Sequence, residues 1–177
     1  MTDGVKKIVV IGPESTGKST LSAALAEELQ TVWVAEYARE YLEQLNMPYT
    51  KDDLTEIAKG QLKQEDELAE QANRCLICDT DLHVIKVWSE AKYNSCDRYI
   101  TEQIATRQYD MYLLTYIDTE WEDDPLREHP APEERTYFYN IYRDIVQNSN
   151  LPWADIRGAH EERLKTALYA IKRHILL

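Results

Sequence analysis

Residues 8–20 have the sequence IVVIGPESTGKST, and this stretch decides the fold that we expect. The apolar run 8–11 stops at Gly12, and a run without a polar face predicts a strand buried in a parallel sheet. The chain then follows the pattern Gly-x4-Gly-Lys-Ser, and Ser19 and Thr20 open a segment whose apolar residues recur three and four positions apart, which predicts a helix. A strand, this loop and a helix are typical of a phosphate-binding P-loop.

The chemistry of this loop favours a nucleotide over an accidental glycine turn. Its glycines let backbone N–H groups turn inward around phosphate oxygens, and the helix that follows adds its N-terminal dipole. Lys18 is expected to reach the β- and γ-phosphates, and the Ser19 hydroxyl to bind Mg²⁺. With ATP as co-substrate and Mg²⁺ as cofactor, the predicted ATP-binding residues are Gly12, Glu14, Ser15, Thr16, Gly17, Lys18, Ser19 and Thr20.

The rest of the chain alternates strand-like and helix-like segments. Besides 8–11, strands are expected at 31–35, 75–78, 111–117 and 151–157, and helices at 19–29, 37–45, 50–73, 83–91, 97–108, 134–148 and 159–176. This alternation predicts an α/β P-loop NTPase fold of three layers, with a parallel five-stranded sheet and helices on both faces. Residues 1–177 are expected to form a single kinase domain, in which the aperiodic stretch 119–135 is a lid.

Charge and composition exclude several classes of function. The net charge is −12, from 32 acidic against 20 basic residues, so no nucleic-acid partner is expected. The chain has no apolar run near the roughly 20 residues of a membrane helix, and its first apolar run is shorter than the roughly 7–15 residues of a signal peptide. We therefore expect a cytoplasmic protein without a membrane partner. Cys75 and Cys78 are expected to be core residues rather than a metal or redox pair.

Acidic residues follow three of the expected strands, at the edge where parallel sheets bind ligands. Asp79 is expected to join Ser19 as a Mg²⁺ ligand; a helix cap is the alternative, and Asp81 fits that cap better. Glu36 is the first candidate for a base that accepts a proton from a sugar hydroxyl. The alternative for Glu36 is a surface ion pair with Arg39 or a lysine.

Arginine and tryptophan residues complete the candidate site. Arg127 and Arg135 lie in the expected lid, from which they could close over the transferring phosphate, although a solvated surface position is the alternative. Trp88 follows the Asp79–Asp81 turn and could stack on a flat base, although aromatic residues in helices are more often part of the core.

Four segments together resemble the ribosylnicotinamide kinase domain of the NadR family. They are the loop 12–19, Glu-Tyr-Ala-Arg-Glu at 36–40, Asp-Thr-Asp at 79–81 and Thr-Glu-Trp-Glu-Asp-Asp-Pro-Leu-Arg at 119–127. Their order and spacing agree from about residue 6 to the C-terminus. The P-loop alone is unspecific, whereas the second and fourth segments together are much more specific.

The resemblance implies that ATP phosphorylates the ribose 5′-hydroxyl of nicotinamide riboside, which gives nicotinamide mononucleotide in NAD biosynthesis or salvage. It also implies a fold like that of nucleoside and nucleotide monophosphate kinases. The predicted catalytic residues are Lys18, Glu36, Asp79 and Arg127, and the predicted substrate-binding residues are Glu36, Tyr37, Arg39, Asp81, Trp88 and Trp121. The choice of base among Glu36, Asp79 and Asp81 stays open.

The sequence departs from the family pattern at two positions. Ala35 stands where some members carry an aromatic residue, and Pro125 stands where a glycine is common. Both departures concern the identity of the acceptor more than the transfer of the phosphoryl group. Since the P-loop begins at residue 12, we expect from this chain neither the adenylyl transfer nor the repression of longer NadR-type proteins. The alternatives are a kinase for another nucleoside or coenzyme precursor, and a regulatory P-loop ATPase. The sequence predicts neither the oligomeric state nor a preference for ATP over GTP.

Overall fold

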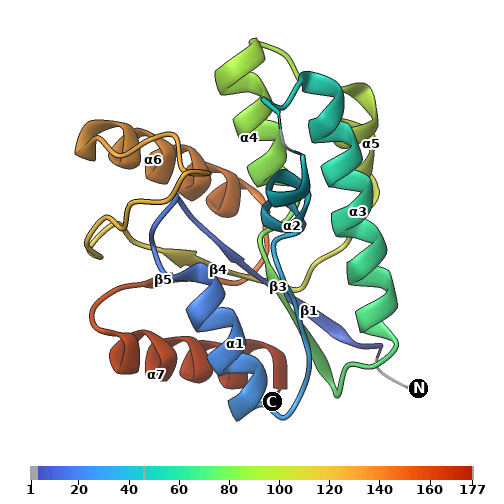
Figure 1. The fold of residues 1–177 in the computed structure, drawn as a ribbon. Helices are drawn as coiled ribbons and strands as arrows, with labels where there is room; N and C mark the ends of the chain where they lie inside the picture. Colours follow the sequence, from blue (N-terminus) through green and yellow to red (C-terminus); the bar gives the residue numbers. More distant parts are fainter. Residues whose placement is uncertain (1–3, 46, 177) are drawn as a thin grey trace.

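A parallel sheet organises the computed structural model, which describes residues 4–45 and 47–176 (Figure 1). Its strands are β1 (Lys6–Ile11), β2 (Trp33–Val34), β3 (Cys75–Asp79), β4 (Met111–Thr115) and β5 (Trp153–Ile156). Their order across the sheet is β2-β3-β1-β4-β5, and every pair of neighbours is parallel. The expected α/β fold is confirmed, with the P-loop strand β1 in the middle.

Helices cover both faces of the sheet (Figure 1). They are α1 (Lys18–Glu28), α2 (Tyr37–Gln44), α3 (Lys51–Ala69), α4 (Leu82–Tyr93), α5 (Arg98–Thr106), α6 (Pro132–Asn148) and α7 (His160–Ile171), followed by the π-helix η1 (Lys172–Leu176). Ile8 and Val10 pack with α1 and α7, whereas Val9 and Ile11 pack with α4 and α6, because successive side chains of a strand point to opposite faces. Helices α2, α3, α4 and α5 share a third cluster.

The two cysteines of β3 follow the same alternation. Cys75 belongs to the core on the α1 and α7 side, and Cys78 to the core on the α4 and α6 side. Both are buried free thiols. The expectation that they are core residues is confirmed, because side chains on opposite faces of one strand cannot bind the same metal.

Several elements are shorter than expected. β2 has two residues instead of the five expected at 31–35, and at its start the Thr31 N–H donates to the Ala26 carbonyl of α1 rather than to β3. β5 begins only after Pro152, which has no N–H to donate to a sheet. α7 ends at Ile171, where η1 replaces the α-helix expected up to residue 176.

The expected lid has neither helix nor strand from residue 116 to residue 131, which we call the lid segment. Arg135 was expected in it but lies in the first turn of α6, because that helix begins at Pro132. Proline is favoured at the first helical position, since its missing N–H would have no helical partner there.

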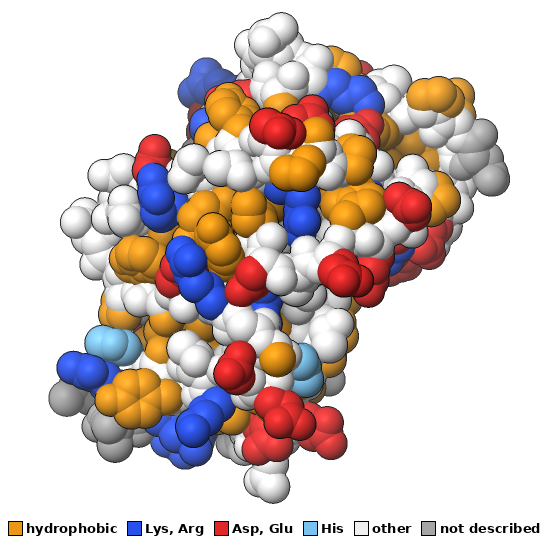
Figure 2. Space-filling model, turned by 90° about the vertical axis from the view of Figure 1, so that its left-hand side faces the viewer, with side chains coloured by type: hydrophobic (Ala, Val, Ile, Leu, Met, Phe, Trp, Pro, Cys, Tyr) orange, Lys and Arg blue, Asp and Glu red, His pale blue; other side chains and the backbone are white. Residues whose placement is uncertain are grey.

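The outer surface mixes charges of both signs. On the face drawn in Figure 2, Lys and Arg side chains are scattered among Asp and Glu side chains, with hydrophobic side chains between them. Among the described residues, no helix is both long enough and apolar enough to cross a membrane.

Candidate active site

A cavity of about 270 Å³ lies at the carboxyl ends of the strands. The P-loop forms its floor, and side chains of α2, α4, α6 and the lid segment complete its walls. Besides residues 12–20, its lining includes Glu36, Ala38, Arg39, Leu42, Val84, Val87, Trp88, Thr119, Glu120, Glu122, Leu126, Arg127, His129, Arg135, Phe138 and Tyr142. All eight predicted ATP-binding residues therefore line one cavity.

The P-loop is pressed against the end of β4. A Cβ atom at Gly12 would lie 2.3 Å from the Thr115 hydroxyl, so only glycine fits there. The Thr16 hydroxyl contacts both the Thr115 hydroxyl, at 2.7 Å, and the Pro13 carbonyl, at 2.8 Å. Gly17, with φ of 74°, turns the chain into α1 and has no side chain that could cap the helix. The first N–H groups of α1 are thus left for an anion.

Lys18 lies folded back on its own loop. Its ammonium donates a hydrogen bond of 2.8 Å to the Pro13 carbonyl. That carbonyl also accepts a hydrogen bond from Thr16, so it holds both side chains of the loop. Lys18 lines the cavity. When a phosphate binds there, the ammonium can donate to a charged phosphate oxygen in place of the neutral Pro13 carbonyl.

Asp79 and Ser19 meet where a cation was predicted. The Ser19 hydroxyl donates a 2.5 Å hydrogen bond to Asp79 Oδ2, whereas the buried Oδ1 has no hydrogen-bond partner among the described residues. Burial, followed by the nearby Glu36 carboxylate, raises the pKa of Asp79 to about 7. A hydroxyl and a carboxylate are the hard oxygen ligands that Mg²⁺ prefers, and a cation would offset the cost of ionising Asp79 there. The two residues therefore fit the metal.

Glu36 places a carboxylate in the cavity lining, to which the fully buried Asp79 does not belong. It is the N-cap residue of α2, and within residues 4–45 and 47–176 its side chain makes neither a hydrogen bond nor an ion pair. The alternative pairing with Arg39 is absent there, because the Arg39 guanidinium binds Asp124 of the lid segment at 2.8 Å. That hydrogen bond raises the pKa of Arg39. Glu36 is thus available to a ligand.

The lid segment lies against the P-loop. The Glu14 carboxylate accepts hydrogen bonds from the N–H groups of Glu128, at 3.1 Å, and His129, at 3.0 Å. The Ser15 hydroxyl accepts another from the Glu122 N–H, at 2.9 Å. Side chains and backbone of the loop thus hold the lid segment over the phosphate site.

Two arginines meet beside Ser15. Arg127 Nη1 lies 3.3 Å from the Ser15 hydroxyl, and Arg135 Nη2 donates to the Ser15 carbonyl at 3.1 Å. Burial, and then the positive charge of Arg127, lower the pKa of Arg135. A phosphate between them would relieve this repulsion. Arg135 was not among the residues predicted to be catalytic, although Pro132, Glu133 and Glu134 are a helix-start signal that could have placed it on a helix.

Trp88 lines the cavity, as do the apolar residues Leu42, Val84 and Phe138. Its indole N–H donates to the Glu128 carboxylate at 3.1 Å and to the Tyr49 hydroxyl at 2.6 Å. Lys92 and Tyr49 also bind Glu128, at 3.0 and 2.8 Å. No sequence pattern indicated Glu128, because its partners come from distant segments of the chain.

Three predicted substrate-binding residues lie outside the cavity lining. Asp81 caps α4 through the His83 N–H and accepts a hydrogen bond from the Tyr112 hydroxyl, at 3.0 and 2.8 Å, which matches the cap alternative. The Tyr37 ring packs over Gly60, where a Cβ atom would lie 2.0 Å from it. The Trp121 ring faces Arg127 and Arg135 instead, each 5.8 Å away.

Comparisons with known proteins agree with this geometry. A family model described as an AAA domain matches residues 7–163. The trifunctional NAD biosynthesis/regulator proteins NadR of Salmonella typhimurium and Escherichia coli are each 26% identical, over 88% and 86% of this chain and 39% and 38% of their own length. The crystal structure of NadR protein in complex with NR is 25% identical, with a TM-score of 0.80, over 98% of this chain and 52% of that chain. The chain thus spans about two fifths of the curated relatives.

Proposed function

We propose that this chain, which belongs to the AAA domain family, transfers the γ-phosphoryl group of ATP to the ribose 5′-hydroxyl of nicotinamide riboside. The observation that carries the proposal is that one cavity holds both the P-loop and the unpaired carboxylate of Glu36. A carboxylate beside the P-loop can take the proton of an attacking water or of an acceptor hydroxyl, and the apolar residues in the same lining favour an organic acceptor. The likeness to NadR in complex with NR supports this acceptor.

The chain's own residues supply the steps of the transfer. The P-loop N–H groups and Lys18 bind the β- and γ-phosphates, for which Lys18 leaves the Pro13 carbonyl. The oxygen of the 5′-hydroxyl forms a bond to the γ-phosphorus while the bond from that phosphorus to the leaving oxygen of ADP breaks. Glu36 accepts the proton that the 5′-hydroxyl loses. Arg127 and Arg135 stabilise the charge on the equatorial oxygens.

Ser19 and Asp79 would hold Mg²⁺, as the orphaned Oδ1 of Asp79 suggests. When bound, the metal would supply positive charge that offsets the negative charge of the phosphates. Burial raises the pKa of Asp79 to about 7, so the carboxyl would have to be ionised to serve as a metal ligand.

The apolar residues of the cavity lining suit the nicotinamide ring. That ring is flat and carries a positive charge in the riboside, so an aromatic face attracts it through both stacking and cation–π forces. Trp88 offers such a face, and its indole N–H is held by Tyr49 and Glu128. The lid segment, which carries Glu128, would keep water out of the site.

ADP release with Mg-ATP tests the proposal against a panel of acceptors: nicotinamide riboside, deoxyadenosine, thymidine, thymidine monophosphate and none. We expect strong stimulation by nicotinamide riboside alone. Stimulation by another member would keep the kinase and reject the acceptor. A slow release that no member changes would favour the regulatory ATPase.

A further inference from the structure

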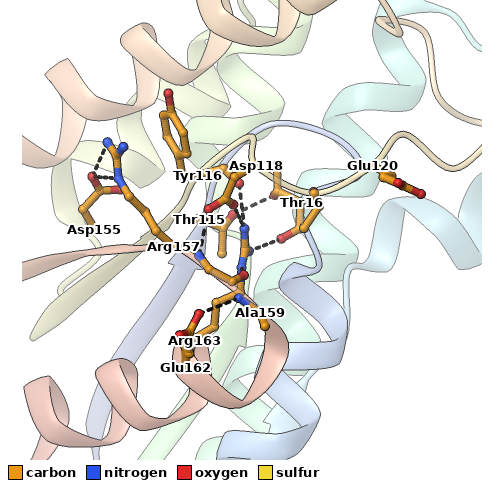
Figure 3. Close-up of polar contacts among 12 residues, drawn as sticks. Thr16, Thr115, Tyr116, Asp118, Glu120, Asp155, Arg157, Ala159, Glu162 and Arg163 are labelled. Carbon is orange, nitrogen blue, oxygen red and sulfur yellow. Dashed lines mark hydrogen bonds and ion pairs between the residues drawn. The ribbon is translucent and has the colours of Figure 1, made fainter.

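Arg163, in the first turn of α7, is almost fully buried, with 4% of its surface exposed (Figure 3). Its guanidinium donates to three backbone carbonyls: Thr16 at 2.7 Å, Gly158 at 2.8 Å and Tyr116 at 3.0 Å. It also forms an ion pair with Asp118. One side chain therefore joins the P-loop, the chain after β4 and the turn before α7.

The contact with Thr16 fixes the direction of a peptide group. A trans peptide is planar, and its C=O and N–H bonds point in opposite directions. Since Arg163 draws the Thr16 carbonyl toward α7, the N–H of Gly17 points away from α7. Gly17 lines the cavity, and its N–H has no hydrogen-bond acceptor among the described residues.

The position of Arg163 is fixed in turn by Asp118. One oxygen of Asp118 binds Arg163, and the other accepts a 2.7 Å hydrogen bond from the Gly158 N–H. The guanidinium thus has a carboxylate and three carbonyls around it, which compensates for the burial of its charge. A planar fork can bind carbonyls in several directions at once, which a lysine ammonium on its flexible stem does not do in a fixed geometry.

We propose that Arg163 is a positioning residue, which aims the Gly17 N–H at the phosphates of the nucleotide by holding the Thr16 carbonyl on the outside of the P-loop. It does not touch the ligand itself. The inference rests on the proposed function only as far as nucleotide binding, and the identity of the acceptor does not affect it.

Calorimetric titration of Mg-AMP-PNP tests this role in the wild type and in Arg163→Lys, which keeps the charge but not the fork. A misdirected N–H loses a hydrogen bond to a charged group, so we expect the Kd to rise about 10-fold. In turnover assays the KM for ATP rises while kcat and the KM for nicotinamide riboside stay within two-fold, because the same N–H serves ground state and transition state. Asp118→Asn, which loosens Arg163 without removing it, should raise the Kd in the same direction.

Arg107→Gln is the matched control. Arg107 also binds a carbonyl, of Leu62, and a buried carboxylate, of Glu65, but far from the P-loop. We expect Arg107→Gln to lower the Tm without changing the Kd. If Arg163→Lys likewise lowers the Tm and leaves the Kd unchanged, Arg163 only holds the fold and the inference is wrong.

The wild type separates this inference from the proposed function. If it binds Mg-AMP-PNP but phosphorylates no nicotinamide riboside, the function is rejected, and the Kd of Arg163→Lys still decides the role of Arg163. If the wild type does not bind Mg-AMP-PNP, both are overturned.

Discussion

Two fully buried carboxylates lie at opposite ends of the sheet, and their surroundings differ. Glu65, near the start of β1, accepts hydrogen bonds from Lys7 at 2.8 Å, Arg107 at 3.1 Å and Tyr109 at 2.9 Å. Asp79, at the end of β3, has one oxygen on Ser19 and the other without a partner among the described residues.

The number of hydrogen-bond partners distinguishes a carboxylate that stabilises the fold from one that is able to bind a ligand. A buried carboxylate with two cationic partners and a phenol needs nothing more, and its burial is compensated within the protein. A buried carboxylate with an unsatisfied oxygen costs stability until something binds it. Burial alone therefore does not identify a site; at Asp79 the unpartnered oxygen, together with the Ser19 hydroxyl of the P-loop beside it, points to a ligand.

Replacing Glu65, whose carboxylate is fully hydrogen-bonded, should have the largest effect on stability. Glu65→Gln leaves Lys7 and Arg107 without their buried counter-charge, so the free energy of unfolding falls by about 3–5 kcal/mol. Urea denaturation measures this change. Asp66→Asn is the control, since Asp66 binds the same arginine while 62% exposed and should cost less than about 1 kcal/mol. Loss of turnover in folded Glu65→Gln would contradict the comparison.

Replacing Asp79, whose Oδ1 has no partner among the described residues, should impair turnover rather than stability. We expect Asp79→Asn to lower kcat about 100- to 1000-fold, because it removes charge from the proposed Mg²⁺ site. The unliganded protein should not lose stability. The folded pKa of about 7 lies above the ordinary value of 3.8, so the folded state binds more protons and Asp79 destabilises the protein as pH rises from about 4 to 7.

Melting curves of unliganded wild type and Asp79→Asn at pH 5 and pH 8 check this sign. The variant should gain stability relative to the wild type at pH 8 and gain less at pH 5. A variant that melts lower at pH 8 would mean that Asp79 holds the fold as Glu65 does.

Glu36 sharpens the comparison within the site, since its carboxylate faces the cavity without being buried. Glu36→Gln should cost about 100-fold in kcat, on the scale of general-base catalysis. Binding of Mg-AMP-PNP, measured by calorimetry, should stay within two-fold. Glu40→Gln, an exposed neighbour on α2, is the control. Unchanged turnover of Glu36→Gln would move the base to another residue.

The smallest effect on turnover is expected from the half-exposed ion pair between α2 and the lid segment. Arg39 binds Asp124 of the lid segment at 2.8 Å. Such pairs contribute little, so Asp124→Asn should lower kcat/KM for nicotinamide riboside about two- to five-fold. Steady-state kinetics measure it, with Asp123→Asn as the neighbouring control. A loss near that of Glu36→Gln would place Arg39 in the chemistry rather than in lid closure.

The sequence predicted features that depend on neighbouring residues. Residues 8–20 predict the P-loop and its strand, and the alternation of elements predicts a parallel sheet, which brings Asp79 to Ser19. What escaped prediction depends on distant partners. The cap of α4 by Asp81 was among the alternatives, whereas its contact with the Tyr112 hydroxyl, 31 residues away, had no local signal. Arg163 reaches Thr16 across 147 residues, which no local pattern could indicate.

The most direct test of phosphoryl transfer is the stoichiometry of its products. Purified protein is incubated with Mg-ATP and nicotinamide riboside, and ADP, inorganic phosphate and nicotinamide mononucleotide are quantified by mass-resolved chromatography over time. We predict that ADP and nicotinamide mononucleotide form in a 1:1 ratio without inorganic phosphate. Formation of ADP and inorganic phosphate without the mononucleotide, at a rate that nicotinamide riboside does not change, would contradict the account.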